Sequence, residues 1–113
     1  MTKIALPVAQ NKLCLHFGHS EGFLVFEVEP EKKKILKEEY FPAPAHEPGL
    51  LPRWLSEKGV NVVITGGMGS RAQNFFREFG IEVLLGASAV EPRKLVQDYL
   101  EGKLERGENV CDH

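Results

Sequence analysis

The stretch that decides the fold is residues 60–70, which read VNVVITGGMGS. Val60–Thr65 is a compact apolar run, typical of a buried strand in a parallel sheet. A glycine-rich turn breaks the run, and a helical pattern with a stop at Gly80 follows. A second apolar run at 81–85 completes a strand–helix–strand unit, which requires parallel strands and a right-handed crossover. The apolar stripe of the intervening helix, which we expect to pack in the core, is Ala72, Phe75, Phe76 and Phe79.

The same pattern extends outward from this unit. A preceding amphipathic helix carries Leu51, Trp54, Leu55 and Lys58 at helical spacing and stops at Gly59. A third helix begins near Pro92, a favoured first-turn residue, and stops at Gly102. Upstream, residues 4–8 form a short strand in which Pro7 is tolerated only near the end. Residues 9–21 read as a loop, and residues 22–41 as a β-hairpin with a half-exposed outer strand.

This order predicts an α/β fold in three layers, α/β/α. We expect a mixed five-stranded sheet with helices on both faces, in the manner of the ribonuclease H-like architecture. The expected strand order is hairpin, first strand, 60–65 and 81–85. We predict one domain over residues 1–102 and an exposed C-terminal tail over 103–113.

Composition and charge exclude several classes of function. The chain has 113 residues, 42% of them hydrophobic and 27% charged, and a net charge of −2. No basic stripe is present, so nucleic acid is not an expected partner. The apolar runs are far shorter than the roughly 20 residues that span a bilayer. Without a membrane segment or a signal-peptide pattern, we expect a cytoplasmic protein.

The predicted topology places several histidines on one rim. The first strand and 60–65 lie side by side and parallel, with connections that leave in opposite directions, which creates a switch-point crevice. The loop 9–21, with Cys14, His16 and His19, opens there, as does Gly66–Ser70. The outer hairpin strand ends on the same edge and leads to His46.

Two short motifs carry metal-ligand chemistry. His16 and His19 lie three apart, and Cys111 and His113 end the sequence two apart. Thiolate and imidazole suit zinc, copper or iron–sulfur species. The 103–113 segment spans at most about 35 Å, enough to return to the rim or to reach a neighbouring subunit. We predict a metal site of His16, His19, Cys111 and His113; solvated histidines and free thiols are the alternative.

Gly66, Gly67, Met68 and Gly69 form the other candidate site. Glycines let backbone N–H groups approach a ligand, and the helix N-terminus that follows favours an anion. The spacing matches neither a Walker loop nor a dinucleotide fingerprint. Met68 is either a soft thioether contact or a packing residue. A tight turn that needs small residues is the alternative explanation.

Catalytic signatures are missing. Neither the first strand nor Val60–Thr65 carries the carboxylates by which ribonuclease H-like nucleases hold Mg²⁺. No Gly-x-Ser-x-Gly elbow is present. Cys14 and His16 are too close in sequence for a typical nucleophile–base pair. We therefore expect no enzymatic activity.

The sequence resembles the dinitrogenase iron–molybdenum cofactor biosynthesis family, the small NifX-type accessory and carrier proteins. The matching elements are residues 3–8, the His16-Phe17-Gly18-His19 segment through Phe26, residues 59–69, 80–83 and 102–104, Pro48–Pro52, and the terminal Cys111-Asp112-His113. The resemblance implies a ribonuclease H-like fold without nuclease activity, with His16 as the family's recurrent histidine and Gly66–Gly69 as its recurrent glycine turn. His19 stands where many members have arginine.

These observations predict non-catalytic binding or carriage of an iron–sulfur or molybdenum-containing cluster, in cofactor assembly or metal homeostasis. Expected partners are the metallocluster and a client or cluster-donor protein. The alternative is a metal-free regulatory domain that binds a nucleotide or another anion at Gly66–Ser70.

Overall fold

A computed structural model describes residues 2–9, 12–13, 21–42, 50–85, 87 and 91–102. The elements in chain order are β1 (Thr2–Ala9), β2 (Lys12–Leu13), β3 (Gly22–Glu29), β4 (Lys34–Pro42), α1 (Leu50–Glu57), β5 (Val62–Ile64), α2 (Ser70–Glu78), β6 (Glu82–Leu84) and α3 (Pro92–Leu100). In this part of the chain, no helix is long and apolar enough to cross a membrane.

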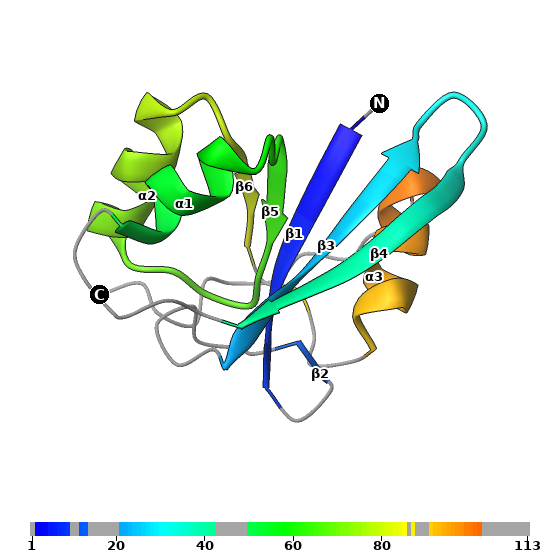
Figure 1. Ribbon diagram of the computed structural model, residues 1–113, viewed down its shortest axis with the longest axis horizontal. Helices are drawn as coiled ribbons and strands as arrows, with labels where there is room; N and C mark the ends of the chain where they lie inside the picture. Colours follow the sequence, from blue (N-terminus) through cyan, green and yellow to red (C-terminus); the bar gives the residue numbers. More distant parts are fainter. Residues whose placement is uncertain are drawn as a thin grey trace.

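The strands form one mixed sheet in the order β4-β3-β1-β5-β6 (Figure 1). β5 runs parallel to β1 and β6, whereas β3 is antiparallel to β1 and β4. The predicted mixed sheet and its strand order are therefore confirmed. The additional strand β2 corrects the expectation that 9–21 is loop throughout. β1 continues past the end of β5, and β2 pairs with the last residues of β1, Val8 and Ala9. This pairing satisfies backbone groups of β1 that β5 cannot reach.

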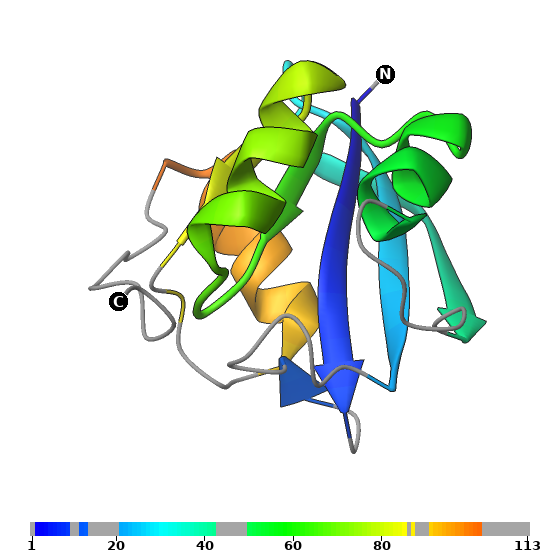
Figure 2. The same cartoon turned by 90° about the vertical axis from the view of Figure 1, so that its left-hand side faces the viewer.

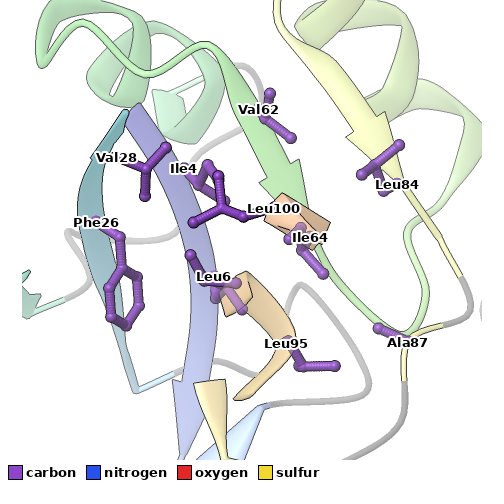
Figure 3. Packing of buried hydrophobic residues seen from close by; sticks show 11 residues of the cluster. Ile4, Leu6, Phe26, Val28, Val62, Ile64, Leu84, Ala87, Leu95 and Leu100 are labelled. Carbon is purple, nitrogen blue, oxygen red and sulfur yellow. The ribbon is translucent and has the colours of Figure 1, made fainter. Parts of the chain in front are cut away.

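Helices cover both faces of the sheet, as predicted. Figure 2 shows α1 and α2 in front of the sheet and α3 behind it. Alternating residues of each strand point to opposite faces, so Ile4 and Leu6 pack toward α3 while Ala5 packs toward α1 and α2. The α3-side cluster in Figure 3 includes Phe26 and Leu95. Full burial of each large apolar side chain stabilises the fold by about 1.5–3 kcal/mol.

Pro7 lies inside β1, a central strand, yet breaks no ladder. The Asn61 N–H donates to the Lys3 carbonyl, and the Glu21 N–H to that of Val8. Odd-numbered β1 residues thus face β5 and even-numbered ones face β3. The N atom of Pro7 faces β5, beyond the paired residues Ile4 and Ala5, so its missing N–H costs no strand pairing.

The predicted helix stops are confirmed. Gly59, Gly80 and Gly102 adopt left-handed backbone with φ of 82°, 73° and 73°. Each follows a helix, where such a residue closes the last turn. Pro92 begins α3, also as predicted.

The predicted core stripe of α2 is only partly correct. Phe76 is fully buried, but Phe79 is 42% exposed and Phe75 is half-buried. Phe79 caps α2 just after its last residue, where the chain turns back toward β6 and no layer covers it.

Aromatic residues fix α1 to the β-hairpin. Trp54 makes edge contacts with Phe23 and Phe41, at ring-centroid distances of 5.6 and 6.1 Å. The Lys58 ammonium lies 3.9 Å from the centroid of the Phe41 ring and 4.7 Å from that of Trp54. This cation–π contact closes the α1 end of the cluster.

Candidate functional site

The structure contains the predicted switch point. β1 and β5 are parallel neighbours; the chain leaves β1 toward β3 on one side and leaves β5 toward β6, through α2, on the other. Such strand ends border a ligand-binding crevice in open α/β sheets. The pairs Val8–Gly22 and Gly22–Pro42 place the end of β4 at this edge as well.

The predicted metal ligands His16, His19, Cys111 and His113 lie outside the described residues, as does His46. That ligand set remains a prediction. The described residues that flank two of these segments, Ala9 with Glu21 and Pro42, lie at the switch-point edge. Within the described ranges, no three His, Cys, Asp or Glu side chains are grouped so as to hold a metal ion.

The glycine turn is held rigidly by its neighbours. The Thr65 N–H donates to the Leu84 carbonyl at 3.0 Å, so the turn starts from the β6 side of the sheet. The Thr65 hydroxyl donates to the Gly67 carbonyl at 3.4 Å, and Gln73 Nε2 to the Met68 carbonyl at 2.8 Å. These bonds occupy the carbonyl oxygens of Gly67 and Met68.

Among the described residues, the N–H groups of Gly66 and Gly67 and those of the first turn of α2 have no backbone acceptor, as is usual for the first turn of a helix. Gly66 and Gly67 are buried, yet the described part of the chain offers their N–H groups no acceptor. Gly69 caps α2 without a side-chain bond, and the first helical bond is Gln73 N–H to the Gly69 carbonyl. Buried unpaired N–H groups are rare in proteins, and a helix N-terminus carries partial positive charge. The turn is therefore suited to an anion.

Backbone conformation does not explain the glycine at position 69. It has φ −65° and ψ 155°, which any residue adopts, and none of Gly66, Gly67 or Gly69 is among the left-handed glycines. Apart from its chain neighbours and the backbone of α2, no atom of the described residues lies within 4 Å of where a Cβ at Gly69 would be. Left-handed backbone therefore does not explain Gly69, whereas its place at the N-cap of α2 does, since glycine is among the residues favoured there.

Met68 contributes packing. Its side chain is 1% exposed and belongs to the core cluster under α1 and α2. Any contact of Met68 with a ligand would come from its backbone. Thr65 and Gln73, which position the turn, were not predicted from the sequence, because their partners are backbone carbonyls that carry no sequence signal.

Comparisons with known proteins agree with this fold. Residues 1–102 match the family described as dinitrogenase iron-molybdenum cofactor. MJ0580 of Methanocaldococcus jannaschii, an uncharacterized protein, is 34% identical over 111 residues, covering 96% of this chain and 93% of the relative.

Solved structures share this fold. The crystal structure of PH0822 matches with a TM-score of 0.85 at 27% identity, covering 93% of this chain and 94% of that one. The apo form of the orange protein from Desulfovibrio gigas matches with a TM-score of 0.73 at 24% identity, covering 96% and 95%. From its match over residues 1–102 and its 34% identical relative, the chain belongs to the dinitrogenase iron-molybdenum cofactor family.

Proposed function

We propose that this protein is a non-catalytic carrier that binds an iron–sulfur or molybdenum-containing cluster as cargo at the switch-point edge. The observation that supports the proposal is the turn at Gly66–Gly69, in which the buried N–H groups of Gly66 and Gly67 find no acceptor among the described residues. Clusters with sulfide and thiolate ligands are bulky anions, and donors of this kind stabilise them. The strand order and the helices on both faces of the sheet support the proposal that the fold is ribonuclease H-like.

In this proposal, direct ligands would come from the histidine and cysteine motifs of the sequence. His16 and His19 follow β1, His46 follows β4, and Cys111 and His113 lie in the proposed tail, 103–113. Imidazole and thiolate groups are suitable donors for iron, copper or molybdenum–sulfur species. In this proposal the side chains hold the metal atoms while the turn binds the outer sulfur atoms.

Anaerobic reconstitution tests the proposal. The purified protein is incubated with ferrous iron and sulfide, or with tetrathiomolybdate, and visible absorption and metal content are measured after desalting. We expect stoichiometric uptake by the wild type and reduced uptake by a His16→Ala, Cys111→Ala variant. Lack of uptake by the wild type would disprove the cargo, and equal uptake by that double variant would disprove the ligand set.

Gly69→Ala tests the turn separately. The added methyl group occupies the open space beside the backbone without a clash in the protein, so it hinders only a ligand that approaches closely. The control is Gly80→Ala, the same substitution beyond the opposite end of α2, away from the turn. We expect Gly69→Ala alone to weaken cluster uptake.

A phosphate or nucleotide is the second candidate ligand, since the same N–H groups fit it. Thermal unfolding with inorganic phosphate, without metal, distinguishes the two. A ligand that binds only the folded state raises stability with concentration. Stabilisation by phosphate, together with no metal in protein purified without oxygen, would favour the metal-free regulatory function.

A further inference from the structure

A separate cavity lies on the α3 face of the sheet, between the β-hairpin and the start of α3. Its volume is about 460 Å³, within the usual range for small-molecule sites. Val8, Leu24, Phe26 and Pro92 provide apolar walls. Leu24 and Phe26 pack with the α3-side cluster, whereas Met68 of the glycine turn packs on the other side of the sheet. The two sites therefore occupy opposite faces.

The charged residues around this cavity are mainly acidic. Glu21, Glu38, Glu91 and Arg93 all line it. Arg93 Nη1 bonds Glu38 Oε1 at 3.0 Å, which ties α3 to β4 and neutralises one carboxylate. Glu91 is the N-cap residue of α3, but its side chain makes no capping bond. Glu91 thus lines the cavity, and its carboxylate makes no capping hydrogen bond.

The positive end of the α3 dipole offsets part of the negative potential of these carboxylates, but its effect is weaker than theirs. A helix N-terminus is equivalent to roughly half a positive charge. Among the described residues that line the cavity, acidic residues outnumber basic ones by two, so the summed charge of these residues is negative. An anionic cluster is disfavoured here, and a cation is attracted.

Tyr40 adds an aromatic wall. A Cβ on Gly22 would overlap the Tyr40 ring and hydroxyl, so glycine at this position lets the ring lie flat across β3. Tyr40 is 54% exposed although it lines the cavity. An exposed tyrosine face beside carboxylates is suited to an ammonium group.

We propose that this cavity binds a small organic cation with an apolar body, of the arylalkyl- or alkylammonium class. The apolar walls contact the body of the ligand, and the Glu91 carboxylate and the Tyr40 ring hold the ammonium group. The proposal is independent of cluster binding, which uses the opposite face and the opposite charge.

Phenethylammonium is the probe, with phenylpropionate as the anionic analogue and phenethyl alcohol as the neutral one. Each is titrated into ¹⁵N-labelled protein, and amide shifts of Leu24, Phe26 and Tyr40 are followed. We expect saturable shifts with phenethylammonium only, and weaker binding as NaCl is raised. Equal binding of the alcohol, binding of the anion instead, or no shift at these amides would overturn the proposal.

Charge-reversal variants locate the site. We expect Glu91→Lys to weaken phenethylammonium binding by about tenfold, because it removes an attraction and adds a repulsion, each worth about threefold to fivefold at an exposed position. Glu78→Lys, at the end of α2 on the other face, makes the same charge change and should leave binding within twofold, a margin of about 0.4 kcal/mol. Equal effects of the two variants would show nonspecific charge attraction and refute the site. Retained dispersion of the amide spectrum confirms that both variants fold.

Discussion

Gly69→Ala and Gly80→Ala form a matched pair at the two ends of α2. The pair tests at which of these positions the backbone conformation requires a glycine. In both positions no atom lies within 4 Å of an added Cβ, so neither variant creates a clash. They differ in backbone, because Gly80 has φ 73° and Gly69 has φ −65°. The two variants therefore compare a glycine that needs left-handed backbone with one that does not.

The expected magnitudes follow from that difference. Left-handed backbone costs an L-residue about 1–2 kcal/mol, and the stiffer unfolded chain of an alanine variant returns about 0.4–1 kcal/mol. Gly80→Ala should thus lower the free energy of unfolding by about 1 kcal/mol, or roughly 4 °C in Tm for a chain of this size. At Gly69 the same unfolded-state gain is offset by the weaker capping of alanine, so the net change should stay within about 0.5 kcal/mol.

Urea denaturation followed by Trp54 fluorescence measures both variants with one probe, and unchanged m-values show that the unfolded states are comparable. Equal destabilisation by the two variants, or a larger loss at Gly69, would refute the assignment of Gly69 to ligand approach. A stable Gly69→Ala that loses cluster uptake would separate the site from the fold.

Three further predictions concern packing and titration. Phe76→Ala should destabilise the fold by about 3–5 kcal/mol because the ring is fully buried, whereas Phe79→Ala should stay within about 0.5 kcal/mol; equal losses in urea denaturation would contradict the burial pattern. Lys58→Met removes the ammonium from the Phe41 and Trp54 rings and should lower stability by about 0.5–1 kcal/mol, with a change in tryptophan emission; an unchanged emission spectrum would argue against the contact. Burial, then the nearby Glu82 charge, raises the pKa of Tyr99, so in a Tyr40→Phe variant tyrosinate absorbance should titrate above the usual value of about 10. Since the folded state holds this proton more firmly, its contribution to stability is complete below the unfolded pKa and is lost as pH rises through the folded pKa; a midpoint at or below the usual value would contradict the burial of Tyr99.

Local rules in the sequence predicted most of the fold. Val62–Ile64 is apolar on both faces because β5 lies inside the sheet with a helix layer on each side. Gly59, Gly80 and Gly102 predicted the helix ends because left-handed backbone is costly for other residues. β-prone residues that are apolar on both faces of 22–29 predicted the inner strand of the hairpin. Each of these signals lies within a short stretch of sequence, so it can be recognised without knowledge of the tertiary contacts.

Other features depended on contacts between distant segments. β2 forms because β1 outlasts β5, a relative length that no local pattern contains. Phe79 matched the helical stripe yet is exposed, since α2 ends before it. The cavity beside α3 joins β1, β3, β4 and Pro92, so it exists only after the sheet and helix have packed.

The sequence by itself determined which groups the predicted site offers: backbone N–H donors in the Gly66–Gly69 turn, and imidazole and thiolate groups among His16, His19, His46, Cys111 and His113. Only the tertiary structure decided which of the turn's groups are free, because the Thr65 hydroxyl and Gln73 occupy its carbonyl oxygens and the core takes the Met68 side chain. Residue type is a local property that the chain carries in any conformation. Accessibility and hydrogen-bond pairing are properties of the packed layers, and they distinguish an open anion-binding turn from a merely small one.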